Sequence, residues 1–220
     1  ISLIENTLNQ IKSLSLNKNT PILITDADEV IFLFLEGLQN FLFNRNLFLD
    51  LNEPRLTGNI KNISSGKTVD QQVMNGLMPE FFSKETENLE LVPDVKKVLE
   101  RLSKRLQIVV LTNIPQKDKN KRENALKNNG MGYPVITNSG LKGEAVKEII
   151  NGIEAKSFFI DDMPLNIDSV SKECPETFCI HFVQDSRLKE LMQTPKSAKI
   201  KAINWIEVEN YILKSLKKVG

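Results

Sequence analysis

The 220-residue sequence has little of the residue types that define several specialised protein classes. It contains two cysteines, Cys174 and Cys179, which are too few for a disulfide framework. A tetrahedral zinc site would need further Cys or His ligands, and the sequence has a single histidine, His181. We therefore expect both cysteines to be small buried side chains near one strand.

Neither sign of charge is in excess, since Lys and Arg total 29, Asp and Glu total 28, and the net charge is +1. A nucleic-acid-binding protein normally carries a basic excess or a basic stripe, so we expect no nucleic-acid partner. The balance argues equally against a polybasic membrane anchor. The contents of hydrophobic residues, 40%, and charged residues, 26%, are typical of soluble globular domains and exclude disorder as the main state.

A secretory signal and a long uninterrupted hydrophobic run are both lacking in this sequence. The longest apolar tract, residues 30–51, contains Glu36, Arg45 and Asp50, each of which is costly in hydrocarbon. We therefore expect soluble helices there and no membrane partner. Together with the few cysteines, this favours a cytoplasmic protein, either a monomer or a homodimer.

Short apolar runs alternate with segments of helical periodicity along most of the chain. The expected strands are residues 22–25, 108–111, 133–137, 157–160 and 177–183. The expected helices are residues 3–15, 31–49, 69–82, 94–105, 118–129, 143–151 and 208–219. This alternation predicts an α/β fold, with a mostly parallel sheet covered by helices on both faces.

Three of the expected strands end in hydroxyl, amide or carboxylate side chains. These are Asp26 and Asp28, Thr112 and Asn113, and Asp161 and Asp162. Because the carboxyl ends of parallel strands meet at one edge of a sheet, we expect these side chains to converge. Lys142, directly before an expected helix, is placed to reach the same edge.

Four carboxylates held close together would repel one another, by about 4 kcal/mol per pair at about 4 Å and an effective dielectric of about 20. A hard divalent cation with oxygen ligands, most naturally Mg²⁺, supplies the missing counter-charge and prefers a few carboxylates plus a substrate phosphate. A Thr hydroxyl, an Asn amide and a Lys ammonium are suitable donors for the remaining phosphoryl oxygens. The pattern therefore predicts a Mg²⁺ site that binds a small phosphorylated metabolite.

Four segments in chain order resemble the sequence motifs of the haloacid dehalogenase-like (HAD) superfamily of hydrolases. The first motif is resembled by residues 22–30 (ILITDADEV), the second by 111–113 (LTN), the third by Lys142 and Gly143, and the fourth by 159–162 (FIDD). The resemblance covers about residues 20–185 and implies a Rossmann-like open parallel sheet with helices on both faces.

The same resemblance implies a role for each matching residue. Asp26 would be the nucleophile, and Asp28 the general acid and base. Thr112, Asn113 and Lys142 would bind the phosphoryl group. The implied Mg²⁺ ligands are Asp26, the backbone carbonyl of Asp28, Asp161 and Asp162, without a choice between the last two as the direct ligand. Lys147 is a rival for the third motif, but we prefer Lys142 because Gly143 lets the backbone approach closely.

The stretch from Asp28 to Thr112 spans 84 residues, too many for a single crossover helix. The resemblance implies that residues 34–90 form a small α-helical cap domain, and that residues 1–33 and 91–220 form the Rossmann-like core. A cap of this kind closes over the site, excludes water and selects the leaving group.

The most polar stretch of the expected cap supplies candidates for substrate contact, although a solvated loop is the simpler interpretation. These candidates are Thr57, Gly58, Lys67 and Thr68. The apolar residues of the 31–49 segment that are expected to form the cap core are Phe32, Phe34, Leu35, Leu38, Phe41 and Leu42. The alternative is that its phenylalanines form a hydrophobic roof over the substrate.

The leading hypothesis is a Mg²⁺-dependent phosphatase that hydrolyses a small phosphomonoester through an aspartyl-phosphate on Asp26. A phosphomutase would use the same residues and return the phosphoryl group to the substrate. A dehalogenase would need neither Mg²⁺ nor Asp28, and a phosphonate hydrolase usually lacks that second acid. The alternative from another class is a phosphate-binding regulatory module without catalysis. Receiver domains do not fit, because they carry their acidic pair first in the chain.

Overall fold

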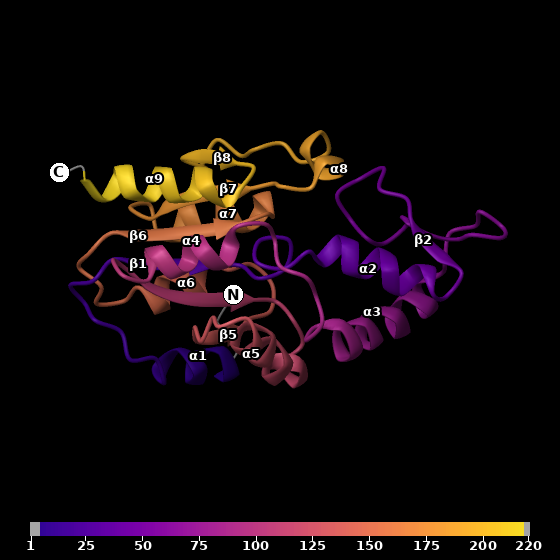
Figure 1. Cartoon of the computed structure of the whole chain (residues 1–220), viewed down its shortest axis with the longest axis horizontal. Helices are drawn as coiled ribbons and strands as arrows, with labels where there is room; N and C mark the ends of the chain where they lie inside the picture. Colours follow the sequence, from indigo (N-terminus) through magenta and orange to yellow (C-terminus); the bar gives the residue numbers. More distant parts are fainter. Residues whose placement is uncertain (1–4, 218–220) are drawn as a thin grey trace.

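The computed structural model describes residues 5–217 of the chain, which form a layered α/β core and an insert (Figure 1). The strands are β1 (Ile22–Thr25), β2 (Leu47–Leu49), β3 (Ile60–Asn62), β4 (Gln107–Thr112), β5 (Val135–Thr137), β6 (Ser157–Asp161), β7 (Phe178–Phe182) and β8 (Ile200–Ala202). The helices are α1 (Glu5–Lys12), α2 (Phe34–Phe43), α3 (Gln71–Glu85), α4 (Val95–Leu102), α5 (Lys119–Asn128), α6 (Gly143–Ile149), α7 (Pro164–Glu173), α8 (Ser186–Lys189) and α9 (Trp205–Lys217), with a short 3₁₀ helix, η1 (Gln116–Asp118).

The core is a parallel sheet with the strand order β5-β4-β1-β6-β7-β8. The first strand, β1, lies between β4 and β6, so the chain builds the sheet outward on both sides of it. Thr25 is in register with Val110 of β4 and Ile160 of β6. The residues that follow these three strands therefore meet at a topological switch point, where open α/β sheets bind their ligands. The expected fold class is confirmed.

Alternate residues of each strand pack against opposite helical layers, as the pleat of a strand requires. In β1, Ile22 and Ile24 join a core cluster with α1, α6 and α7, whereas Leu23 joins the cluster that includes α4, α5 and α9. All three side chains are fully buried. Because both faces of the sheet are covered, its central strands are continuous apolar runs that end abruptly at polar residues.

The insert between β1 and β4 lies apart from the sheet in Figure 1 and contains α2, β2, β3 and α3. The two chain segments that connect it to the core run side by side. The backbone N–H of Leu33 donates to the carbonyl of Glu90 at 2.8 Å, and that of Val92 donates to Ile31 at 2.8 Å. Between the two helices, β2 and β3 form an antiparallel pair, which the sequence analysis did not expect.

Residues 31–49 were expected to form one or two helices, and they form one helix that is shorter than the apolar run. Helix α2 ends at Phe43, and Asn46 adopts a left-handed conformation with φ 58°, so the chain reverses there before β2 begins. Asn tolerates this conformation better than most residues, because its side chain is short and polar. Apolar character alone did not distinguish the helix from the strand that follows it.

At the two chain ends, the expected helix over residues 3–15 and the expected helix over 208–219 correspond to α1 and α9. Residues 3–4 and 218–219 of those expectations lie outside the described residues.

Cys174 and Cys179 are free and buried, as expected, and burial raises their pKa values to about 11 and about 12.

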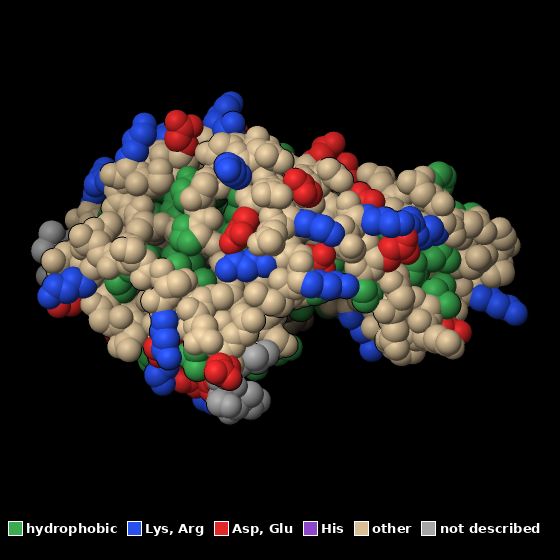
Figure 2. Space-filling model, turned by 90° about the horizontal axis from the view of Figure 1, so that it is seen from below, with side chains coloured by type: hydrophobic (Ala, Val, Ile, Leu, Met, Phe, Trp, Pro, Cys, Tyr) green, Lys and Arg blue, Asp and Glu red, His purple; other side chains and the backbone are tan. Residues whose placement is uncertain are grey.

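The charged residues are distributed in keeping with the near-zero net charge. Basic and acidic side chains are interspersed over the face shown in Figure 2. Among residues 5–217, no helix is long and apolar enough to span a membrane.

Candidate active site

Asp26 is held directly after β1, at the centre of the sheet edge. Its backbone N–H donates to the carbonyl of Ile160 at 2.8 Å, which continues the ladder between β1 and β6 by one residue. The residue is 7% exposed. Burial raises the pKa of Asp26 to about 7, with Lys142 opposing the shift and Asp161 adding to it. Asp26 is therefore a carboxylate that needs a positive partner to stay ionised.

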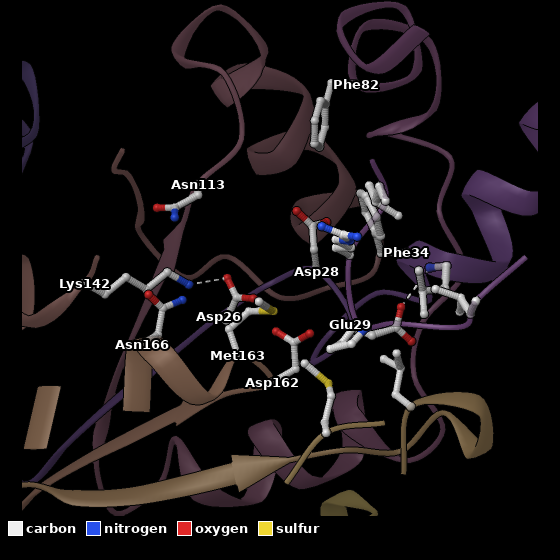
Figure 3. Close-up of a pocket in the computed structure, with 17 residues that line it drawn as sticks. Asp26, Asp28, Glu29, Phe34, Phe82, Asn113, Lys142, Asp162, Met163 and Asn166 are labelled. Carbon is white, nitrogen blue, oxygen red and sulfur yellow. Dashed lines mark hydrogen bonds and ion pairs between the residues drawn. The ribbon is translucent and has the colours of Figure 1, made fainter. Parts of the chain in front are cut away.

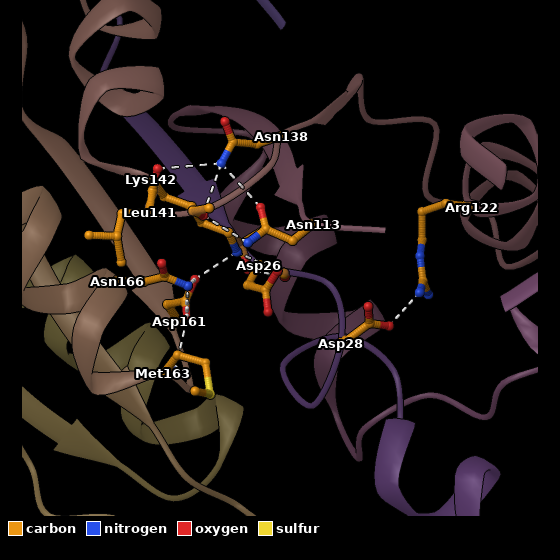
Figure 4. A network of polar contacts seen from close by, with 12 residues as sticks. Asp26, Asp28, Asn113, Arg122, Asn138, Leu141, Lys142, Asp161, Met163 and Asn166 are labelled. Atoms are coloured by element: carbon orange, nitrogen blue, oxygen red, sulfur yellow. Dashed lines mark hydrogen bonds and ion pairs between the residues drawn. The ribbon is translucent and has the colours of Figure 1, made fainter. Parts of the chain in front are cut away.

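The positive partner of Asp26 is Lys142, the residue directly before α6. Its Nζ lies 2.6 Å from Oδ1 of Asp26 and 2.7 Å from Oδ2 of Asp161, and the residue is 1% exposed (Figure 4). Burial disfavours the ammonium, but the two carboxylates outweigh burial, so the pKa of Lys142 rises above its ordinary value. The rival Lys147 lies on the surface in an ion pair with Glu173 at 3.1 Å.

Gly143 allows the segment that carries Lys142 to approach α7. A Cβ at this position would lie 2.5 Å from the backbone oxygen of Ser169. The Gly143 N–H instead donates to the hydroxyl of Ser169 at 3.1 Å. Gly143 thus lets the start of α6 pack closely on α7.

Asp161, the last residue of β6, is fully buried and already surrounded by donors. Besides Lys142, it accepts from the backbone N–H of Met163 at 2.9 Å and from Nδ2 of Asn166 at 3.0 Å. Sequence reasoning missed Asn166. Its signal is Pro164, which opens α7 two residues after Asp162, so the first turn of that helix lies next to the strand end.

The neighbouring Asp162 faces the cavity described below, and its backbone carbonyl contacts Nε2 of His181 at 2.8 Å. Loss of water around it, with Asp161 and Asp26 nearby, raises the pKa of Asp162 well above its ordinary value. Oxygen atoms of Asp26, Asp161 and Asp162 lie within 4.8 Å of one another.

Three carboxylates against one ammonium leave an excess of negative charge at this point. An all-oxygen donor set with excess negative charge fits a hard divalent cation such as Mg²⁺. The residues present therefore fit the metal that the sequence motifs imply.

Thr112 is the last residue of β4 and Asn113 is the next residue, on the other side of Asp26. The Thr112 hydroxyl is fully buried and has no hydrogen-bond partner among the described residues. An unpaired buried hydroxyl costs about 1–3 kcal/mol, so this group is available to an incoming acceptor. The Asn113 side chain donates to the carbonyl of Gly140 at 2.9 Å and accepts from Nδ2 of Asn138 at 3.1 Å. These bonds tie the loop after β4 to the segment that precedes Lys142.

Asp28 points away from this group and toward α5 (Figure 4). Its Oδ1 accepts from Nη2 of Arg122, whose side chain is completely buried. The Arg122 guanidinium lies over the ring of Phe32 at 4.5 Å from its centroid, and its Nε and Nη1 have no hydrogen-bond partner among the described residues. Helix α5 is almost entirely polar in sequence, so nothing local indicated that one of its arginines would be buried here.

Glu29 is a second acid that sequence reasoning did not single out. It adopts a left-handed backbone conformation with φ 62° and is 4% exposed. Its carboxylate accepts from the backbone N–H of Leu35 at 2.8 Å and from Nε2 of Gln184 at 3.0 Å. Burial raises the pKa of Glu29 to about 7. These bonds hold the start of α2 against the loop after β7.

A cavity of about 400 Å³ opens between the sheet edge and the insert (Figure 3). Five of the residues expected to form the site line it, namely Asp26, Asp28, Asn113, Lys142 and Asp162. Asp161 and Thr112 are buried and are not among its lining residues. The structure does not bring Lys67 to the cavity, because Lys67 is exposed in the loop after β3. Thr57, Gly58 and Thr68 are likewise exposed and outside it.

No protein-family model matches the chain, and no curated protein matches its sequence. Solved structures do match over almost their whole length. A conserved haloacid dehalogenase-like protein of unknown function from Agrobacterium tumefaciens has a TM-score of 0.62 and 11% identity, over 90% of this chain and 100% of its own. A candidate phosphatase from Clostridium difficile has a TM-score of 0.60 and 16% identity, over 89% of this chain and 100% of its own. A candidate HAD hydrolase from Bacillus subtilis bound to magnesium has a TM-score of 0.53 and 12% identity, over 89% of this chain and 100% of its own.

Proposed function

The chain has the haloacid dehalogenase-like fold, and from this premise we propose that it is a Mg²⁺-dependent phosphatase that acts on a small phosphomonoester. The observation that carries the proposal is the position of Lys142. Its ammonium bridges Asp26 and Asp161 at 2.6 and 2.7 Å, with Asp162 beside them. A buried lysine among three carboxylates leaves a site short of positive charge, which suits a divalent cation and a phosphate bound together.

The candidate phosphatase and the magnesium-bound protein among the similar structures support this choice of reaction class and metal. In our proposal, Mg²⁺ is held by Asp26, Asp162 and the backbone carbonyl of Asp28. Asp161 is already bonded to three donors, which favours Asp162 as the direct ligand. When bound, the cation neutralises phosphoryl charge and stabilises the carboxylates in their ionised form.

The reaction would proceed in two steps at the side chains of the first motif. A carboxylate oxygen of Asp26 forms a bond to phosphorus as the ester P–O bond breaks, and Asp28 gives its proton to the leaving oxygen. A water molecule then loses a proton to Asp28 and attacks phosphorus. The Asp26–phosphate bond breaks, and inorganic phosphate leaves. Lys142 and the unpaired hydroxyl of Thr112 would stabilise the phosphoryl oxygens.

The pair between Asp28 and Arg122 bears directly on this mechanism. In the structure the carboxylate of Asp28 is turned toward Arg122, so it must leave that partner to reach a leaving oxygen next to Asp26. The exposed fraction of the Asp28 side chain, 21%, leaves room for such a rotation. In this proposal, substrate binding and release of Asp28 occur together.

The test is hydrolysis of p-nitrophenyl phosphate by the purified chain with Mg²⁺. We expect turnover that EDTA abolishes and added Mg²⁺ restores, and a loss of several orders of magnitude in Asp26→Asn. Asp168→Asn is the matched control, because Asp168 is an exposed carboxylate that contacts Ser197 on the surface. Equal turnover in Asp26→Asn and Asp168→Asn would refute the proposal. Phosphoryl transfer to a second substrate hydroxyl, without phosphate release, would indicate the phosphomutase instead.

A further inference from the structure

The cavity is strongly divided in chemical character. Asp26, Lys142 and Asp162 lie at one end with Asn113 and Asn166, whereas the insert side is formed by apolar side chains. Figure 3 shows Phe34 and Phe82 across the cavity from Asp26 and Lys142. The groups that would handle phosphate are therefore gathered at one end, and most of the other side chains in the lining are apolar.

The apolar part is assembled from four separate segments of the chain. Its side chains come from α2, the loop between β2 and β3, α3 and the α8 region: Phe34, Leu51, Leu56, Phe82, Leu188 and Met192. The rings of Phe34 and Phe82 also contact each other, with 6.0 Å between their centroids and an angle of 36° between their planes. Of the phenylalanines that the sequence analysis considered for a hydrophobic roof, Phe34 lines the cavity, whereas Phe32 and Phe41 pack in the core.

Three charged side chains, Asp28, Glu29 and Arg55, line the cavity outside the polar end, and each has a partner. Asp28 accepts from Nη2 of Arg122. Glu29 accepts from the backbone of Leu35 and from Gln184. Arg55 pairs with Glu53 at 2.6 Å, and 65% of its side chain is exposed. Both carboxylate oxygens of Glu29 therefore have donors, and one guanidinium nitrogen of the exposed Arg55 is engaged by Glu53.

A sugar or glycerol leaving group would have to exchange its water for this apolar surface. Hydroxyls that lose water without gaining a partner bind poorly, whereas an alkyl or aryl group gains from the same transfer. Because the proposed function places the phosphate at the polar end, we infer that the leaving group is apolar. The substrate class is thus a phosphomonoester of an alicyclic, aromatic or similarly hydrophobic alcohol, rather than a sugar phosphate. This inference rests on the proposed phosphatase function.

Two substrates of matched shape test it: cyclohexylmethyl phosphate and glucose 6-phosphate. Both carry phosphate on a CH₂ group attached to a six-membered ring, so they differ chiefly in the ring oxygen and the hydroxyls. We expect kcat/KM to be about 10²-fold higher for cyclohexylmethyl phosphate, since unpaired hydroxyls and lost apolar contact act in the same direction. Equal or higher kcat/KM for glucose 6-phosphate would overturn the inference and leave the phosphatase proposal intact.

Variants of the apolar wall provide a second measurement. The two variants are Leu56→Asn, in the loop between β2 and β3, and Phe82→Ser, on α3. Each variant should raise KM for cyclohexylmethyl phosphate about 10-fold. Each should also bring the kcat/KM values for cyclohexylmethyl phosphate and glucose 6-phosphate closer together. Phe43→Ser is the control, because Phe43 is 69% exposed at the end of α2 and outside the cavity. Equal KM values in all three variants would overturn the inference.

Turnover of p-nitrophenyl phosphate distinguishes failure of the apolar-leaving-group inference from failure of the proposed phosphatase function. Turnover of this compound, together with a kcat/KM for glucose 6-phosphate that equals or exceeds that for cyclohexylmethyl phosphate, contradicts the apolar leaving group alone. No turnover of any of the three compounds with Mg²⁺ contradicts the phosphatase, and the inference that rests on it.

Discussion

Replacing Lys142 with methionine removes one positive charge from the site and keeps most of the side-chain volume. The ammonium is 2.6 Å from Asp26 and 2.7 Å from Asp161, and both carboxylates are buried. Removing one partner of a buried ionic group costs about 3–5 kcal/mol, because the other partner keeps its desolvation penalty. For a chain of this size, that corresponds to a fall of about 6–20 °C in Tm.

The cost of Lys142→Met should depend on pH in a defined direction. Burial raises the pKa of Asp26 to about 7 even with the lysine present, and Lys142 lowers that pKa. A carboxyl group whose folded pKa exceeds its unfolded pKa binds more protons in the folded state, so stability falls as pH rises between the two values. The variant should therefore lose more stability at pH 8 than at pH 5.

Urea unfolding in EDTA, followed by circular dichroism, measures this cost. Lys147→Met is the control, since its exposed pair with Glu173 contributes at most about 1 kcal/mol. Adding Asp161→Asn to Lys142→Met should recover part of the lost stability, because one of the unpaired carboxylates is then neutral. A loss in Lys142→Met no larger than that in Lys147→Met, and independent of pH, would refute the electrostatic reasoning.

Three further predictions concern packing, pH and metal choice. Gly143→Ala should destabilise the chain by about 1–3 kcal/mol in urea unfolding, because its Cβ would lie 2.5 Å from the backbone oxygen of Ser169. Gly76→Ala in α3 is the control, and it should be neutral or stabilising in the same assay, because its Cβ meets nothing within 4 Å. Glu209→Gln should lower the urea midpoint at pH 7 by removing the pair with Arg101. Hydrogen bonds from Arg101 lower the pKa of Glu209, so this difference should shrink as pH falls below the ordinary Glu value, and a constant difference would contradict the pairing. Ca²⁺ in place of Mg²⁺ should inhibit phosphate release, since its larger and looser coordination would misplace Asp26, and full activity with Ca²⁺ would count against in-line attack.

The part of the site predicted from the sequence is the part set by strand ends. Asp26, Asn113 and Asp161 each lie at or after the end of an apolar run, and a parallel sheet necessarily brings such ends to one edge. The adjacent glycine favoured Lys142 over Lys147, and packing against Ser169 accounts for that glycine. These predictions needed only local patterns and one rule of topology.

The residues that were missed depend on packing between distant segments. Arg122 belongs to a polar helix, and only its position over Phe32 buries it. Glu29 is joined to Gln184, 155 residues further along the chain. Strand β8 has three residues and pairs only with β7, so its periodicity was too short to recognise.

The apolar end of the cavity was not recognisable in the sequence for the same reason. Its wall combines α2, α3, the β2–β3 loop and the α8 region, and no single segment shows the pattern of a pocket. The polar stretch that contains Lys67 attracted attention by composition, yet it lies outside the cavity. Composition identifies exposed loops well, but it does not indicate which loops face a ligand.

Attack of Asp26 on phosphorus is tested most directly by trapping the product of that attack. Asp28→Asn, which slows release of the phosphoryl group in this mechanism, is mixed with Mg²⁺ and p-nitrophenyl phosphate, whose leaving group departs without a proton. The mixture is quenched in acid within the first turnover and reduced with borohydride, which converts an aspartyl-phosphate to homoserine. Peptide mass spectrometry should find homoserine at position 26 and none without Mg²⁺. Release of p-nitrophenol with position 26 unchanged would contradict the account.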